Sequence, residues 1–265
     1  PQREFGVKCW WDNGHGATDL VRGITYSCDV VFYEIGKGFY NAGSEGMQET
    51  FRRYGLGSAT GIDLPGEEVG RVPDAAWKWD YYKELGYSDE DATWKPGENC
   101  NIAIGQGDLL VTCLQMACAY CSLANKGPVW RPHVMRACGR AWETASSPST
   151  APSRSETRGG RGVPRHRRAR HVGRRLRGGP HADLALDQLD ITVHGKTGTG
   201  EQITLDRNIA WFGAYGPAED PKYVVFANLD GALSGGAAAL LVVRDVFGAI
   251  YGQPDTSIAT TTNVD

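Results

Sequence analysis

The most informative segment of the chain reads His194-Gly195-Lys196-Thr197-Gly198-Thr199-Gly200-Glu201. It stands at the end of a predicted β-strand, because residues 191–194 alternate apolar and polar side chains. A lysine here supplies positive potential to an anionic substrate and to a nearby serine, and threonine hydroxyls can bind a carboxylate. Gly198 leaves space for a substrate along the strand edge, and a backbone N–H beyond it can donate to a developing oxyanion. By itself Lys-Thr-Gly is a weak signal, since any turn can contain it.

The residues after this segment predict a small sheet closed by a helix. Residues 208–215 and 223–229 are typical of two further strands, and residues 216–221 are typical of the turn between them. Residues 235–251 have the pattern of a helix.

Helices are predicted before this segment. Helical patterns cover residues 19–40, with a break near Ser27, residues 44–54 and residues 113–125. Thr112 and Gln115 have the spacing of a capping box at the start of the last of these. Residues 78–99 are polar and aromatic, and we expect a surface excursion there. Helices, then three strands and a last helix predict an α+β fold, with helices packed on an antiparallel sheet.

The seven cysteines are scattered, and their odd number argues against a disulfide framework. Cys113, Cys118 and Cys121 have the C-x4-C-x2-C spacing of some iron–sulfur sites. Cys118 and Cys121 also fall on the apolar face of a predicted helix, so we interpret them as small core residues.

A second candidate element, Ser27-Cys28-Asp29, lies at the break between two helical stretches. A serine two residues from a short polar side chain is related to the S-D-N element of active-site serine acyltransferases. Serine is also a common helix N-cap, which would make Ser27 the cap of a helix beginning at Cys28. Taken alone, the element favours the capping role.

Further segments connect these two elements. They include I-G-Q-G at residues 104–107, T-C-L-Q-M-A at residues 112–117, and A-W-F-G-A-Y at residues 210–215, besides residues 26–36 and 54–67. In order and spacing the set resembles class B penicillin-binding proteins, and the elongation-type transpeptidase above all. The resemblance covers roughly residues 5–138 and 188–252.

The resemblance implies a penicillin-binding, serine β-lactamase-like transpeptidase fold. It also implies a D,D-transpeptidase that cross-links the D-Ala-D-Ala stem peptides of peptidoglycan by serine acyl transfer and binds β-lactams. The parent protein would be anchored in the cell membrane, with an extracytoplasmic catalytic domain, and would work with a cell-elongation glycosyltransferase. No metal or organic cofactor is implied.

Family roles can be carried over to matching positions. Ser27 would belong to the proton-relay network, Asp29 would hold that network and the substrate amide, and Lys196 would polarise the relay. Substrate binding would fall to the three residues after the lysine, which are Thr197, Gly198 and Thr199. The N–H of Thr199 would also form one half of the oxyanion hole.

The chain departs from the family at the nucleophile. The family's nucleophile lies in an S-x-x-K motif, and none of the eight lysines here follows a serine by three positions. Ser122 and Lys126 are four apart, which is the wrong spacing. We therefore expect a chain that starts past the nucleophile helix, with a fold incomplete at the N-terminus and no activity alone. We likewise expect the family's membrane anchor to lie outside this sequence.

An arginine-rich segment interrupts the match. Residues 140–177 contain 11 of the 20 arginines and only two acidic residues. The segment is interpreted as a reading-frame error or a disordered insert, and the good register of the match on both sides favours the frame error. A nucleic-acid-binding arm is disfavoured, because no lysine or aromatic residue follows Trp142 within it and the rest of the chain is acidic.

The predicted organisation therefore has four parts. They are a helical part of the transpeptidase domain at 1–139, the aberrant segment at 140–187, the K-T-G strand, sheet and last helix of the same domain at 188–252, and a tail at 253–265. Two alternatives remain within the same fold: a serine β-lactamase or β-lactam sensor domain, and a non-catalytic scaffold.

Overall fold

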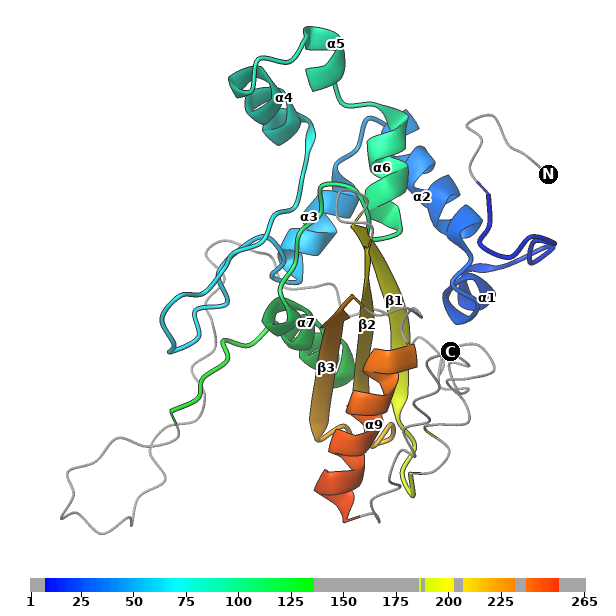
Figure 1. Ribbon diagram of the computed structural model, residues 1–265, viewed down its shortest axis with the longest axis vertical. Helices are drawn as coiled ribbons and strands as arrows, with labels where there is room; N and C mark the ends of the chain where they lie inside the picture. The colour runs from blue at the N-terminus through cyan, green and yellow to red at the C-terminus, as the bar shows by residue number, and fades with distance from the viewer. Residues whose placement is uncertain (1–7, 136–185, 187–188, 203–206, 232–236, 253–265) are drawn as a thin grey trace, which may run out of the picture. The chain divides into compact units, whose positions relative to one another are not determined.

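The computed structural model describes residues 8–135, 186, 189–202, 207–231 and 237–252 (Figure 1). The chain divides into two compact units, residues 1–177 and 178–265, and each is described by itself. The predicted segment 140–187, apart from Leu186, and the predicted tail lie outside the described residues. Among the described helices, none has the length and apolar character needed to cross a membrane.

The first unit is helical. Its helices are α1 (Leu20–Thr25), α2 (Asp29–Asn41), α3 (Gly46–Arg53), α4 (Ala75–Glu84), α5 (Asp89–Ala92), α6 (Pro96–Ala103) and α7 (Cys113–Asn125). The predicted helix over 113–125 is confirmed, and so is its capping box. Thr112 Oγ1 accepts from the Gln115 N–H at 3.1 Å, and Gln115 Oε1 accepts from the Thr112 N–H at 3.0 Å. Each side chain accepts a hydrogen bond from a backbone N–H that has no partner within the helix.

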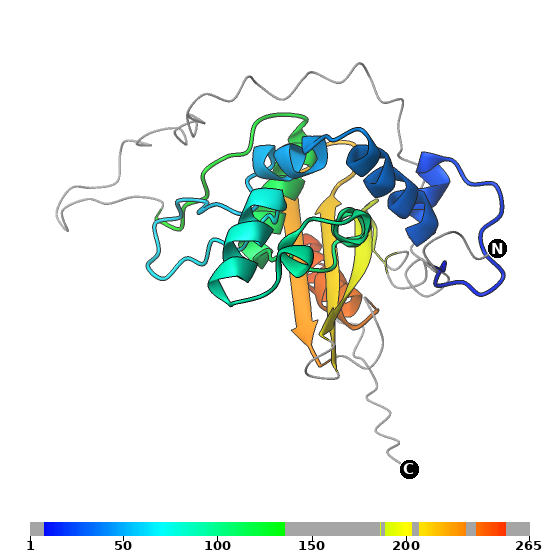
Figure 2. The same cartoon turned by 90° about the horizontal axis from the view of Figure 1, so that it is seen from above.

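Helices α2 and α6 lie side by side in this unit (Figure 2). Their approach requires Gly36, because a Cβ at that position would stand 2.5 Å from the Asn99 carbonyl oxygen. Buried Asn99 donates from Nδ2 to the Gly36 carbonyl at 3.1 Å and accepts from Trp94 Nε1 at 2.7 Å. A glycine and a satisfied amide thus hold α6 against the helix that starts at Asp29.

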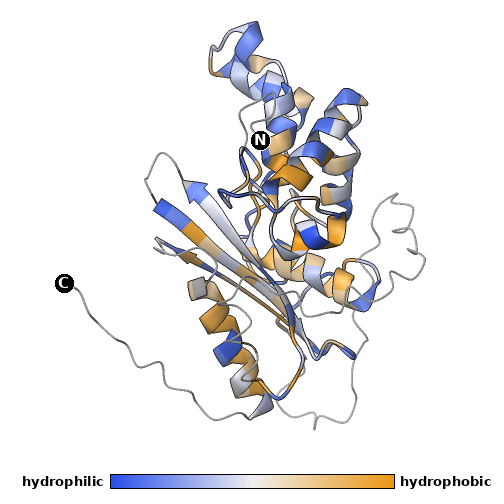
Figure 3. Ribbon diagram, turned by 90° about the vertical axis from the view of Figure 1, so that its right-hand side faces the viewer, coloured by the Kyte–Doolittle hydropathy of each residue, from blue (hydrophilic) through white to orange (hydrophobic). Residues whose placement is uncertain are grey.

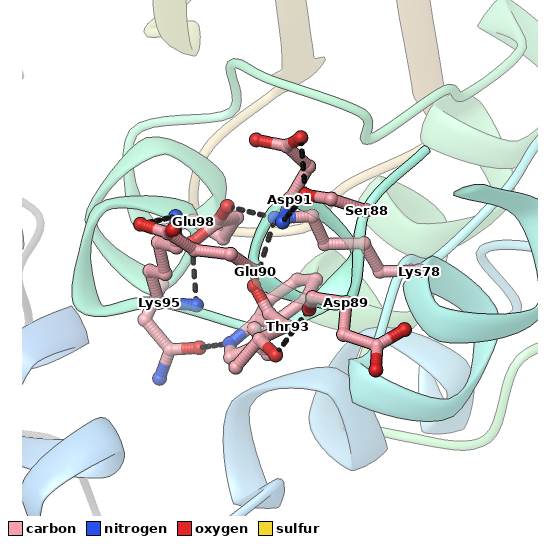
Figure 4. Close-up of polar contacts among 10 residues, drawn as sticks. Lys78, Ser88, Asp89, Glu90, Asp91, Thr93, Lys95 and Glu98 are labelled. Atoms are coloured by element: carbon pink, nitrogen blue, oxygen red, sulfur yellow. Dashed lines mark hydrogen bonds and ion pairs between the residues drawn. The ribbon is translucent and has the colours of Figure 1, made fainter. Parts of the chain in front are cut away.

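Residues 78–99 are mostly exposed, as expected of a surface excursion, and they contribute to helices α4, α5 and α6. Lys78 is buried: its ammonium donates to the Thr93 carbonyl at 3.0 Å, pairs with the Glu98 carboxylate, and lies 5.1 Å from the centre of the Tyr82 ring (Figure 4). A helix whose buried face carries a paired lysine shows no apolar stripe. The lack of such a stripe explains why α4 has no helical signature in the sequence.

In its described residues, the second unit contains an antiparallel sheet in the order β1-β2-β3 and a long helix after it. The strands are β1 (His194–Gln202), β2 (Arg207–Gly216) and β3 (Tyr223–Asp230), and the helix is α9 (Ala237–Tyr251). Apolar side chains join α9 to one face of the sheet (Figure 3); they include Ala210, Phe212, Ala214, Leu240, Val243 and Phe247. The predicted strands at 208–215 and 223–229 and the last helix are confirmed within two residues.

Strand β1 differs from its prediction. It begins at His194, where the predicted strand ended, and it contains the whole Lys-Thr-Gly segment. Three glycines lower the strand propensity of this segment, and pairing with β2 overrides that preference. Gly195 is required there, since a Cβ would stand 2.5 Å from Cζ of buried Phe212.

Candidate active site

The Ser27 corner joins α1 to α2. The Ser27 N–H donates to the Ile24 carbonyl at 3.3 Å, and the Cys28 N–H donates to the Gly23 carbonyl at 2.9 Å. Ser27 itself has φ of +50°. This pair of bonds around a left-handed residue is the Schellman motif, which satisfies the last carbonyls of a helix.

Ser27 therefore closes α1, and its predicted role as the N-cap of the next helix is wrong. The N-cap of α2 is Cys28, which makes no side-chain capping bond. The left-handed position normally holds glycine, and another residue there costs about 1 kcal/mol. Such strain is found at functional sites, so the serine at this corner points to a use of its hydroxyl.

Asp29 begins α2, directly after the corner. A carboxylate in the first turn of a helix interacts favourably with the helix dipole. Cys28 between the two residues is buried. The corner thus brings Ser27 and Asp29 together at one helix start.

Lys196, Thr197, Gly198 and Thr199 all lie on β1, as the resemblance implied. β2 is the partner of β1 among the described strands, so β1 forms an edge of the described sheet. The Lys196 ammonium donates to the Thr197 carbonyl at 2.8 Å. An edge strand offers backbone donors and acceptors to an extended peptide.

Register places these side chains on two faces. Lys196 stands opposite Gly213, whereas Thr197 stands opposite Phe212. Because opposed residues share a face and neighbours alternate, Lys196 lies on the face away from α9, and Thr197 and Thr199 lie on the other. Gly198 is on the lysine face, where a Cβ would stand 3.3 Å from Cβ of Trp211.

His194 and Tyr215 form a pair that the sequence analysis missed. Their side chains are opposed across β1 and β2, with His194 Nδ1 3.1 Å from the Tyr215 hydroxyl and the rings in edge contact. Burial raises the pKa of Tyr215, so it stays a neutral phenol. The pair stands next to Lys196 on the same face. Only the strand register could have revealed it.

The candidate residues fall into both units. Ser27 and Asp29 belong to the first unit, and Lys196 to Thr199 belong to the second. Within each group the residues are neighbours along the chain, and Lys196 and the two threonines lie on opposite faces of β1.

Cys9, His15 and Cys28 form the group of described side chains that can hold a metal ion. One ligand atom from each lies within 4.8 Å of the others, and Cys9 Sγ is 3.0 Å from His15 Nδ1. Two thiolates and an imidazole are ligands that zinc accepts. Burial is the main cause that raises the pKa of Cys9, so metal binding would have to displace its proton. The sequence analysis missed this group because its three residues do not have the spacing of a familiar metal-binding motif.

The iron–sulfur interpretation of the other cysteines is not supported. Cys113, Cys118 and Cys121 lie on the regular helix α7, and Cys118 is buried. Burial raises the pKa of Cys118 to about 11, which keeps it a thiol at neutral pH. Both features agree with core packing.

Comparison with known proteins identifies the family of the chain. Residues 3–251 match the family model of the penicillin binding protein transpeptidase domain. The chain belongs to this family. The match includes residues of both units.

Three similar proteins describe where the chain stands within the family. The peptidoglycan D,D-transpeptidase MrdA of Haemophilus influenzae is 31% identical over 268 residues, covering 92% of this chain and 38% of the relative. PBP2 of Helicobacter pylori, solved in complex with MreC, is 25% identical with a TM-score of 0.66, covering 92% of this chain and 42% of that one. A chain of a peptidoglycan synthase complex that coordinates polymerization and crosslinking is 26% identical with a TM-score of 0.73, covering 94% and 40%.

The transpeptidase domain described here is thus homologous to MrdA-type D,D-transpeptidases and has the fold of penicillin-binding proteins. The predicted family and α+β fold are confirmed. The chain spans about two fifths of the length of the relatives described above.

Proposed function

We propose that this chain supplies the S-x-D and K-T-G elements of a peptidoglycan D,D-transpeptidase. The observation that carries the proposal is the left-handed serine at the Ser27 corner, directly before Asp29, in a chain that matches the transpeptidase family. A strained serine where glycine fits better needs a reason beyond folding. Proton transfer during acyl transfer supplies that reason.

In this proposal the Ser27 hydroxyl passes the proton between the nucleophile and the leaving D-Ala amine. Asp29 holds the Ser27 hydroxyl and the substrate amide in place. The Lys196 ammonium adds positive potential to the relay, which favours the anionic tetrahedral intermediate.

Substrate binding falls to the edge strand β1. An extended stem peptide would pair with the strand by β-addition, with its terminal carboxylate bound by Thr197 and Thr199. The Thr199 N–H would donate to the oxyanion, and Gly198 would leave room for the peptide. β-Lactams would occupy the same place.

The nucleophile is not among these 265 residues, since no lysine follows a serine by three positions. We propose that the chain acts only together with a segment carrying S-x-x-K. The whole protein would act in the extracytoplasmic space, attached to the membrane, with a glycosyltransferase of the cell-elongation machinery as partner. The relative from a peptidoglycan synthase complex that coordinates polymerization and crosslinking supports a partner that polymerises peptidoglycan. The H. pylori relative in complex with MreC is a second example of a relative that works in an assembly.

A chimaera tests the proposal. The part of H. influenzae MrdA that precedes its matched region is fused before Pro1, and the purified protein is incubated with fluorescent penicillin. We expect a covalent adduct that is lost in Lys196→Ala. A chimaera in which the serine of the donated S-x-x-K motif is changed to alanine is the negative control.

A folded chimaera, shown by circular dichroism and gel filtration, that forms no adduct would contradict the proposal. So would an adduct that survives Lys196→Ala at the same rate. Unmodified MrdA is the positive control.

A further inference from the structure

We propose that Trp10 is a positioning residue for the Ser27 corner, holding it in its strained conformation through the indole N–H. The inference rests on the proposed role of Ser27 in the proton relay. Trp10 lies outside every motif that identified the chain, and it comes from a segment well before the corner.

The indole of Trp10 bridges two successive carbonyls at the corner. Nε1 donates to the Ser27 carbonyl at 2.9 Å and to the Tyr26 carbonyl at 3.1 Å. Carbonyls at the end of a helix have no partner within the helix. The indole therefore acts as a cap that adds to the Schellman bonds of Ser27 and Cys28.

The side chain stays at this position although it is 58% exposed. Rings hold it there: His15 is in edge contact with Trp10 at 5.5 Å between centroids, and His15 stacks on Tyr26 at 5.4 Å with 3° between the planes. Trp10, His15 and Tyr26 form an aromatic clasp around the peptide that precedes Ser27. Tyr26 belongs to the corner, so the clasp is attached to the backbone that it holds.

The clasp bears on chemistry because the direction of a hydroxyl follows from its backbone torsions. A left-handed serine without support relaxes toward negative φ, which turns its Cα–Cβ bond. Acyl transfer is sensitive to sub-ångström misplacement of the groups that move protons. Trp10 thus positions Ser27 without contacting the substrate.

The first test uses the 265-residue chain itself. Trp10→Phe keeps a ring for His15 and removes the N–H donor. Trp11→Phe is the matched control, since the described contacts of Trp11 are with the rings of Trp10 and His15. We expect amide hydrogen exchange at Ser27 and Cys28 to become about fivefold faster in Trp10→Phe and to stay within twofold in Trp11→Phe.

The second test uses the acylating chimaera. We expect Trp10→Phe to slow the acylation rate constant about fivefold and to change the dissociation constant of the non-covalent penicillin complex less than twofold, since carboxylate binding belongs to β1. If Trp10 had only a structural role, Trp10→Phe would lower the melting temperature and would not slow acylation selectively over penicillin binding. Measurements are made well below the melting temperature of each variant.

Each outcome decides between the two proposals. Unchanged exchange at the corner overturns the clasp. Faster exchange with unchanged acylation overturns the positioning role and leaves the proposed function intact. A wild-type chimaera without an adduct overturns the proposed function, and the exchange measurement still tests the clasp.

Discussion

At Ser27 the backbone and the side chain meet different demands. The left-handed φ of +50° closes α1 and favours glycine, whereas the proposed relay needs a hydroxyl. Folding and function are therefore opposed at one residue, and substitution can separate them.

We expect Ser27→Gly to raise the free energy of unfolding of the chain by about 1 kcal/mol, because it removes the left-handed strain. Urea unfolding followed by circular dichroism measures this change. Ser27→Ala is the control: it also deletes the hydroxyl, keeps the Cβ, and should bring no stabilisation. Equal stabilities for the two variants would mean that the corner is not strained.

Gly195 is a second residue where a missing side chain matters. We expect Gly195→Ala to destabilise the second unit by about 2 kcal/mol, because the added Cβ would press on buried Phe212 in the packing with α9. Thermal unfolding followed by the near-ultraviolet signal measures the loss. If Gly195→Ala kept the wild-type melting temperature, the sheet would be able to adjust to the added methyl group without loss of stability.

Among the elements, α2 carries the candidate site at its first residue and packs on α6 along its length. The position of Asp29 thus depends on contacts made two turns away. Gly36 and Gly38 differ only in what a Cβ would meet.

We expect Gly36→Ala to destabilise the chain by about 2 kcal/mol, because its Cβ would clash with the Asn99 backbone of α6. Gly38→Ala should stabilise it by about 0.5–1 kcal/mol, since no atom beyond the neighbouring backbone of α2 stands within 4 Å of the added Cβ and alanine favours helix. Chemical denaturation of both variants checks the opposite signs. Two changes of the same sign would contradict the α2–α6 contact.

The loop at residues 60–67 contains a carboxylate that joins it to the segment near residue 134. Asp63 accepts from the Val134 N–H at 2.6 Å and from the Met135 N–H at 2.8 Å, and these bonds hold the pKa of Asp63 below its ordinary value of 3.8. The carboxylate form is favoured in the folded state. The ionised Asp63 carboxylate therefore stabilises the folded state fully above the ordinary pKa. This stabilisation is lost as the pH falls through the lowered pKa of the folded state.

We expect the stability difference between the wild-type chain and Asp63→Asn to be constant near neutral pH and to shrink below pH 3.8. Urea midpoints between pH 7 and pH 3 measure it. A difference that grows toward low pH would contradict the assigned bonds.

At the scale of the whole molecule, the proposed function needs three elements, of which the chain would supply two. Lys-Thr-Gly and the S-x-D corner are present, and S-x-x-K is not among its residues. Removing the nucleophile from an acyl-transfer site leaves only binding and electrostatic contributions.

We therefore expect no covalent adduct when the 265-residue chain is incubated with benzylpenicillin. Intact-mass spectrometry measures this, with a complete penicillin-binding protein as the positive control. An increase by the mass of one penicillin would show that another side chain of the chain acts as nucleophile.

Sequence patterns by themselves determined the family, the two motifs, the capped helix over 113–125 and the strands β2 and β3. These features depend on local periodicity, caps and motif residues, which neighbours along the chain encode. Only the tertiary structure decided the rest: the buried Lys78 in α4, the left-handed Ser27, the Trp10 hydrogen bonds, and the pairing of His194 with Tyr215. Each of these depends on a partner distant in the sequence or on a backbone torsion, and no residue type or spacing specifies either one alone.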